Sequence, residues 1–217
     1  MFARASGWAL LALGTAGCFG SEVTEFPDGM EPLEENLAPE PAGDFPEAIA
    51  FASGERDGLY WVHGRGYVHA PISEVMAALS RPDVVVDRRG VDEWSVQQDV
   101  EDGFDLSFAI TTTVRDIITV EWTTTWRYLV VDGVLTAPEV LAIRYQKTDG
   151  IALIDTFQGS IVATRLEEEL TRIELIEHLD APNTSEDDLL CYQQDLFDEL
   201  VLVTNGEELP EYEDSCR

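Results

Sequence analysis

ITVEWTTTWRYLV, residues 118–130, is the stretch that decides the fold class. Its apolar and aromatic residues alternate with polar ones, which is the period of a strand with one buried face. β-branched and aromatic side chains, which favour strands, fill most of its positions. We therefore expect a long strand whose buried face carries seven residues: Ile118, Val120, Trp122, Thr124, Trp126, Tyr128 and Val130.

Further strands are predicted on both sides of this stretch. Asp132-Gly133 and Asp149-Gly150 are turn signals, so successive strands should run antiparallel. Gly159 predicts a bulge or a sharp bend within its strand. Together with the opening stretch, the predicted strands make a sheet of about seven: 59–69, 94–100, 104–110, 140–147, 151–166 and 170–179.

Helices are predicted at two places. After the first strand, Pro71 opens a short one, because a proline at the first helical position loses no hydrogen bond, and residues 83–88 are expected to add a second short turn of helix. Ser185 should cap a long one that stops at Asn205-Gly206, with acidic residues in its first turn. Its apolar face comprises Leu189, Leu190, Leu196, Phe197, Leu200 and Val201.

This order of elements resembles the helix-grip fold of the START and Bet v 1-like superfamily, which includes polyketide cyclase-like proteins. The resemblance covers roughly residues 59–205 and implies an α+β domain at 54–205. It also implies a curved antiparallel sheet wrapped on the long C-terminal helix, with an apolar cavity between them. Three stretches carry it: GYVHAPISEVMAAL (66–79), GSIV (159–162) and LTRIELIEHLDAP (170–182).

The aromatic residues on the buried face have two interpretations. They could line a cavity and grip an apolar ligand, or they could simply fill the core between sheet and helix. Our leading hypothesis is non-catalytic binding of a small apolar molecule, such as a lipid, sterol-like or polyketide-like compound, with no cofactor. The candidate ligand-binding residues are Phe108, Trp122, Trp126, Tyr128 and Phe157.

Two other functions stay open. The first is an enzyme of cyclase or hydrolase type in the same cavity, although the sequence contains no catalytic motif such as G-x-S-x-G or H-E-x-x-H. The second is a protein-interaction module with a filled core. His63 and His69 are interpreted as surface or strand-end residues, so no metal site is expected. The enzyme would need a buried ionisable pair from Arg115, Arg144, Asp155, Glu174 or His178.

The N-terminus has the pattern of an export signal. Residues 1–17 combine a positively charged start with a short apolar run, as signal peptides do. TAGC, residues 15–18, resembles the lipobox of bacterial lipoproteins, with Thr15 in place of the usual Leu. We expect a lipid on Cys18; ordinary cleavage near Ala16 is the alternative. Phe19 after the cysteine favours an outer membrane, if the organism has two, so a lipid-anchored protein of the cell envelope is expected.

Charge excludes several partners. The chain has 43 acidic and 13 basic residues and a net charge of −30, which repels nucleic acid and anionic lipid. Membrane contact should therefore come from the anchor alone. Residues 18–53 are predicted to be an acidic, proline-rich linker; alternatively, part of this segment packs on the domain through Phe26, Phe45 and Phe51.

Two cysteines remain if Cys18 is acylated. Cys191 should lie on the solvent side of the last helix, and the acidic tail 206–217 could bring Cys216 back to it. We expect a disulfide between them, as an exported compartment permits. Free thiols or an intermolecular bond are the alternatives.

Overall fold

The computed structural model describes residues 26–115, 118–151 and 153–212. The expected signal peptide, Cys18 and Cys216 lie outside these residues, so the lipid and the disulfide stay predictions. Within the described residues no helix is long and apolar enough to cross a membrane. The elements are β1 (Ile49–Arg56), β2 (Leu59–Val68), α1 (Ile72–Leu79), α2 (Pro82–Val85), β3 (Glu93–Gln98), β4 (Leu106–Arg115), β5 (Thr119–Val134), β6 (Ala137–Gly150), β7 (Thr156–Glu167), β8 (Leu170–Asp180) and α3 (Glu186–Thr204).

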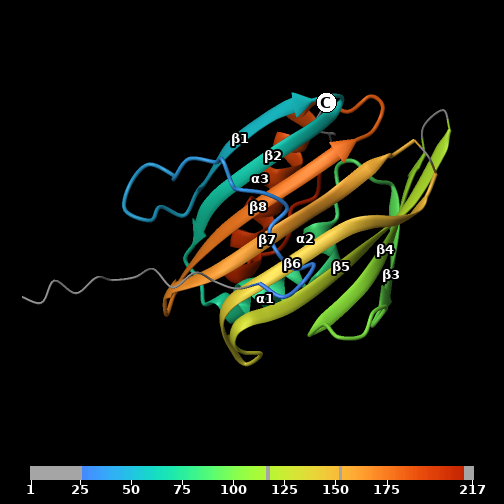
Figure 1. Cartoon of the computed structure of the whole chain (residues 1–217). Helices are drawn as coiled ribbons and strands as arrows, with labels where there is room; N and C mark the ends of the chain where they lie inside the picture. The colour runs from blue at the N-terminus through green and yellow to red at the C-terminus, as the bar shows by residue number, and fades with distance from the viewer. Residues whose placement is uncertain (1–25, 116–117, 152, 213–217) are drawn as a thin grey trace, which may run out of the picture.

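The strands form one antiparallel sheet in the order β1-β2-β8-β7-β6-β5-β4-β3. The sheet curves, and all three helices lie against the same face of it (Figure 1). α3 packs against β1, β2 and α1. The predicted α+β class and the long C-terminal helix are therefore confirmed.

The sheet has eight strands, not about seven. The additional strand is β1, which pairs along its whole length with β2 and includes residues assigned to the linker. Its sequence, IAFASGER, is poor in large β-branched residues, so its pattern is weak. Gly54 explains part of this composition, because a Cβ there would lie 2.8 Å from the Trp61 ring. The expected domain start at 54 thus falls inside β1.

Two predicted strand limits are also different. Asp132-Gly133 does not end its strand: β5 continues to Val134, and the two residues lie at register shifts against β6. β7 begins at Thr156, five residues later than expected. At Asp132-Gly133 the local turn propensity is outweighed by pairing with β6.

The core lies between the inner face of the sheet and the helices. β5 contributes Trp126 and Tyr128, which are 2% and 0% exposed. α3 contributes Leu196, Phe197 and Leu200 from its apolar face. The predicted cap of α3 is present: the Ser185 side chain accepts a hydrogen bond from the Asp188 backbone N–H, and the Asp188 carboxylate accepts one from the Ser185 N–H.

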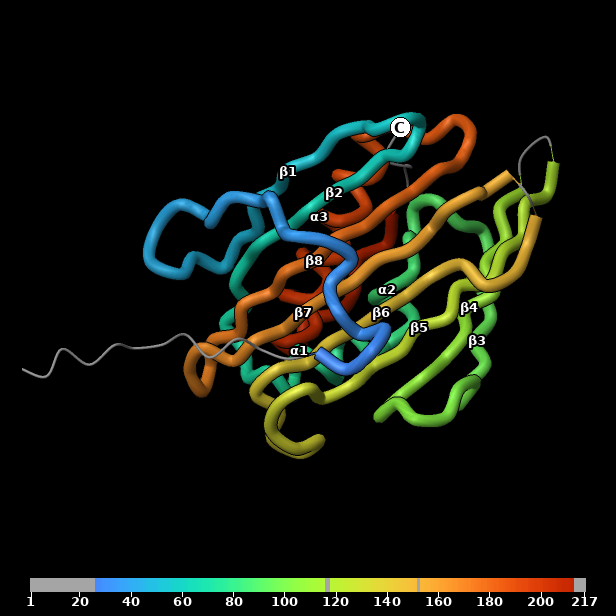
Figure 2. The backbone as a smooth tube through the Cα atoms, in the orientation of Figure 1, coloured from blue at the N-terminus to red at the C-terminus, as the bar shows by residue number. Residues whose placement is uncertain are grey.

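Residues 26–48 lie across the outer face of the sheet as an arm (Figure 2). The Leu33 N–H donates to Ser160 Oγ at 3.1 Å, and the Asn36 side chain donates to the Gly64 carbonyl at 2.9 Å. Met30 and Ala38 are each only 2% exposed. These residues therefore differ from the extended spacer expected over 18–53 and match the alternative of a packed arm.

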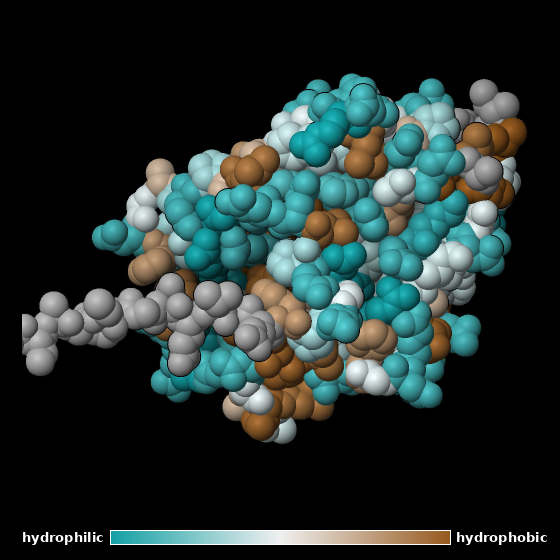
Figure 3. Space-filling model, viewed as in Figure 1, coloured by the Kyte–Doolittle hydropathy of each residue, from teal (hydrophilic) through white to brown (hydrophobic). Residues whose placement is uncertain are grey.

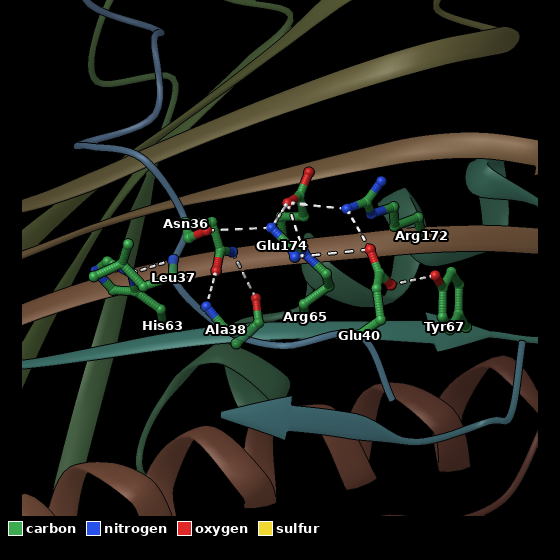
Figure 4. A network of polar contacts seen from close by, with 10 residues as sticks. Asn36, Leu37, Ala38, Glu40, His63, Arg65, Tyr67, Arg172 and Glu174 are labelled. Atoms are coloured by element: carbon green, nitrogen blue, oxygen red, sulfur yellow. Dashed lines mark hydrogen bonds and ion pairs between the residues drawn. The ribbon is translucent and has the colours of Figure 1, made fainter. Parts of the chain in front are cut away.

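Ion pairs fix the end of the arm. Glu40 pairs with Arg172 at 2.9 Å and Arg65 at 3.7 Å, and it accepts a short hydrogen bond from the Tyr67 hydroxyl. Arg65 also pairs with Glu174 at 3.1 Å. Figure 4 shows these side chains along β2 and β8. An acidic arm can dock here because arginines gather on this part of the outer face.

Candidate functional site

A cavity of about 350 Å³ opens on the inner face of the sheet. Its walls come from the segment after α2, the paired ends of β4 and β5, the loop before β7, the end of β8 and the first turns of α3. Apolar side chains at its edge remain exposed: Ile118 is 56% exposed and Leu153 is 40% exposed. Figure 3 shows apolar atoms at the end of the molecule where these loops lie.

The five aromatic residues selected from the sequence divide into two groups. Trp122, Trp126 and Phe157 line the cavity. Phe108 and Tyr128 do not line it, and both are 0% exposed in the core. The Tyr128 hydroxyl donates to the backbone carbonyl of Leu79 at 2.7 Å. Part of the aromatic face therefore lines a cavity, and the rest of it fills the core. The position of a residue along its strand decides which of the two applies.

Glu177 is a further site residue, and it was not predicted from the sequence. It is 1% exposed on β8, and it lines the cavity. Its Oε2 accepts a hydrogen bond of 2.5 Å from the Tyr145 hydroxyl. A signal was available, because Glu177 interrupts an inward-facing alternation of Ile173, Leu175 and Leu179.

Gly159 makes the contact between Tyr145 and Glu177 possible. Tyr145, Gly159 and Glu177 are register partners on β6, β7 and β8. A Cβ on Gly159 would lie 2.0 Å from the Tyr145 ring, so the ring occupies the space that a side chain would need. The pairing of β7 with β6 and β8 shows no register shift at this glycine. Of the two predicted alternatives at Gly159, a bulge or a sharp bend, the bulge is therefore wrong, and the glycine allows the close approach of the Tyr145 ring.

Burial controls the ionisation of Glu177. It raises the pKa of this carboxyl to about 8, while the hydrogen bond from Tyr145 acts in the opposite direction. Asp87 lies near enough to raise the pKa further by charge repulsion. Glu177 is consequently protonated at neutral pH, and it presents a neutral carboxylic acid to the cavity.

The wall also contains polar residues other than Glu177. Burial raises the pKa of Asp87, whose carboxylate accepts backbone N–H bonds from Arg89 and Gly90. Thr124 is 3% exposed, and its hydroxyl has no hydrogen-bond partner in the described part of the chain. The remaining polar residues of the wall are Asp188, Thr112, Asn183, Thr184 and Tyr192. No Arg, Lys or His of the described residues lines the cavity.

None of the five residues considered for a catalytic pair lines the cavity. Arg115 pairs with Glu93 at the exposed edge of the sheet, and Glu174 pairs with Arg65 beneath the arm. The side chains of Arg115 and Glu174 lie at the rim and on the outer face, because strand alternation points them away from the cavity. Arg144, Asp155 and His178 likewise lie outside the cavity wall.

Two histidines meet the arm on the outer face. Oε1 of Glu34 lies 3.0 Å from Nε2 of His63 and 2.9 Å from Nε2 of His178. Hydrogen bonds from His178 and His63 lower the pKa of Glu34, against the effect of burial. Burial lowers the pKa of His63, against the effect of Glu34. The interpretation of His63 as a surface or strand-end residue is wrong, because it lies within β2 under the arm and is 0% exposed. His69 is exposed, and it contacts Phe45 and Glu47.

The geometry of this cluster suits hydrogen bonding better than metal binding. The three groups could in principle hold an ion, because their ligand atoms lie within 4.8 Å of one another. However, Nδ1 of His63 accepts the Leu37 N–H at 2.8 Å. Neutral His63 must then carry its proton on Nε2, which donates to Glu34 and has no lone pair for a metal. We interpret the cluster as a clamp on the arm.

Comparison with known proteins gives structural matches only. No protein-family model matches the chain, and no curated protein matches it in sequence. Human STARD10 superposes with a TM-score of 0.57 at 12% identity, covering 86% of this chain and 85% of that one. Human StAR-related lipid transfer protein 5 gives 0.50 at 10% identity, covering 81% and 86%. The chain has a START-like helix-grip fold.

These matches confirm the fold resemblance inferred from the sequence. The lipid transfer and protein localization domain of human StarD13 also matches, with a TM-score of 0.50, 11% identity, and coverage of 73% of this chain and 83% of that one. At such identities the likeness shows the fold. The START-like chain must therefore be assigned a function from its own cavity.

Proposed function

We propose that this START-like domain binds a small, mostly apolar molecule in the cavity and does not transform it. The observation that carries the proposal is the cavity itself, with its apolar and aromatic wall. Its volume of about 350 Å³ lies at the low end of the range of known ligand sites, roughly 300–1,000 Å³. The volume favours a compact ligand over a large lipid with two acyl chains.

The composition of the wall supports binding more than catalysis. Trp122, Trp126 and Phe157 offer flat apolar surface, and the exposed Ile118 and Leu153 form an apolar entrance. The residues considered for a catalytic pair lie elsewhere. The similarity to human proteins named for lipid transfer is in line with a hydrophobic ligand.

Isothermal titration of the full-length protein with 2-naphthalenemethanol tests the proposal. Val120 lines the cavity, whereas Val134 lies 60% exposed at the far end of the same strand and does not line it. We expect Val120→Phe to fill the site and weaken binding at least about tenfold. Val134→Phe, the matched control, should bind within about twofold of the natural protein. Absence of binding, or equal affinity in Val120→Phe, would overturn the proposal.

The domain is further proposed to be held in the cell envelope by a lipid on Cys18. The TAGC sequence and the preceding apolar run support this. An anchor with more than one acyl chain holds a protein stably at the membrane, so the domain itself needs no membrane-binding surface. The expressed protein should partition into the detergent phase of a Triton X-114 extraction, and Cys18→Ser should move it to the aqueous phase. Equal partition of both would contradict the anchor.

A further inference from the structure

The residues of the cavity wall that can carry a full charge near neutral pH are all acids. Among the described residues, the titratable acids that line it are Asp87, Glu177 and Asp188, and there is no basic residue to balance them. The whole chain, with a net charge of −30, adds to the same field. A carboxylate or phosphate placed in this cavity would meet repulsion without a counter-charge.

Two buried polar groups offer hydrogen bonds to a ligand. Glu177 is 1% exposed, and one of its oxygens is occupied by Tyr145. Thr124 is 3% exposed, and its hydroxyl has no hydrogen-bond partner among the described residues. Because buried polar groups are normally satisfied, this hydroxyl indicates a partner that enters the cavity. Both groups can accept a hydrogen bond.

The apolar part of the wall also suits a cation. Trp122, Trp126 and Phe157 contribute aromatic rings to the wall, and aromatic rings attract positive charge at their faces. An ammonium group has three donors and no acceptor. It therefore matches a wall that combines aromatic faces, acceptors and carboxyl groups.

We infer that the ligand is an apolar molecule carrying an amine, with the amine directed to Glu177 and Thr124. The inference rests on the proposed binding function, which it makes more specific. The natural amine need not be known for the test, because simple naphthalene derivatives differ in the polar group alone.

Binding should depend on pH. Glu177 faces Tyr145 on β6, Asp87 after α2, and Tyr192 and Gln193 on α3. Its raised pKa means that an arriving ammonium must promote loss of the Glu177 proton. Affinity for an amine should accordingly increase between pH 6 and pH 8, by up to about tenfold per pH unit. A neutral alcohol should bind with little change over this range.

The experiment is calorimetric titration of the full-length protein with 2-naphthylmethylamine, 2-naphthalenemethanol and 2-naphthoate at pH 6 and pH 8. At pH 8 we expect the amine to bind at least about tenfold more tightly than the alcohol, and naphthoate most weakly. Binding of the alcohol without preference for the amine would overturn this inference and leave the proposed function standing. Binding of none of the three would overturn the proposed function itself.

Three variants test which residues cause the preference for the amine over the alcohol. Glu177→Gln should reduce amine affinity to that of the alcohol and remove the pH dependence. Glu121→Gln, an exposed acid on β5 outside the cavity wall, is the control and should leave the preference intact. Thr124→Val should weaken the amine several-fold; it removes a hydroxyl with no partner among the described residues, so the fold should tolerate it. An unchanged amine preference in both Glu177→Gln and Thr124→Val would contradict the assignment.

Discussion

Glu177 is a carboxyl group at a position that strand alternation assigns to the core. Its folded pKa of about 8 lies above the ordinary value of 4.5, so the folded state holds a proton that the unfolded state releases. Stability supplied by this difference is lost as pH rises from about 4.5 through 8. Between pH 5.5 and 7.5 the loss should be on the order of 2 kcal/mol.

Urea unfolding of the natural protein and of Glu177→Gln at these two pH values measures this effect. The free energy of unfolding of the natural protein should fall relative to that of Glu177→Gln as pH rises. Glu121→Gln should follow the natural protein, because Glu121 is exposed. Parallel pH dependence in all three proteins would show that Glu177 ionises normally.

Gly159 gives a second prediction for single residues. Its missing side chain makes room for the Tyr145 ring, so Gly159→Ala should cost about 2 kcal/mol of unfolding free energy through overpacking. In a Tyr145→Leu background the same change should cost less than about 1 kcal/mol. Chemical denaturation of the four proteins gives the coupling, and equal costs in both backgrounds would rule out the proposed contact.

Single residues also show where sequence reasoning succeeded and where it stopped. Alternation over 118–130 placed Trp122, Trp126 and Tyr128 on one face, as the structure has them. It could not tell which of them border the cavity, because that depends on how far α3 and the loops extend along the sheet. Glu177 could have been selected, since an acid on an apolar face is a recognisable exception.

At the scale of elements, α3 begins with a capping box at Ser185. Removing the side-chain acceptor by Ser185→Ala should lower the free energy of unfolding by about 1 kcal/mol. Ser95→Ala, on the exposed edge strand β3, is a matched control with an expected change within about 0.5 kcal/mol. Thermal or urea unfolding would refute the role of the cap if the two variants lost equal stability.

The arm gives another prediction at this scale. Glu34 accepts from two histidines, and the neighbouring Leu37 N–H donates to His63. Glu34→Ala should therefore speed hydrogen exchange of the Leu37 amide about tenfold, without changing the amides of β2. Glu35→Ala, an exposed neighbour, should have no such effect. An unchanged exchange rate of the Leu37 amide in Glu34→Ala would contradict the proposed clamp on the arm.

Elements with strong local patterns were predictable, and those stabilised by distant partners were not. The long strand, the last helix and its cap follow from periodicity and capping residues. β1 has a weak pattern of its own and is held by its hairpin partner β2, which begins at Leu59. The arm also has a weak pattern, and it depends on residues far along the chain, Ser160 and Arg172 on the outer face. The acidic, proline-rich composition of the arm is typical of a linker. It does not show that arginines elsewhere in the sequence form ion pairs with the arm.

In the whole molecule, the curved sheet separates two different surfaces. The inner face holds the core and the cavity, while the outer face holds the arm with its ion pairs and histidines (Figures 1 and 2). Through its resemblance to helix-grip proteins, the order of elements predicted the sheet and α3 on the inner face, but it did not predict the arm on the outer face. The existence and size of the cavity could not be predicted, because the same aromatic face would suit a filled core.

The most direct test of the central claim is a crystal structure of the full-length protein with 2-naphthalenemethanol. The account predicts the naphthalene ring in the cavity, in contact with Trp122, Trp126 and Phe157, and its hydroxyl near Thr124 or Glu177. A cavity filled by its own side chains, with the probe absent or bound elsewhere, would contradict the claim that this fold serves to bind an apolar ligand.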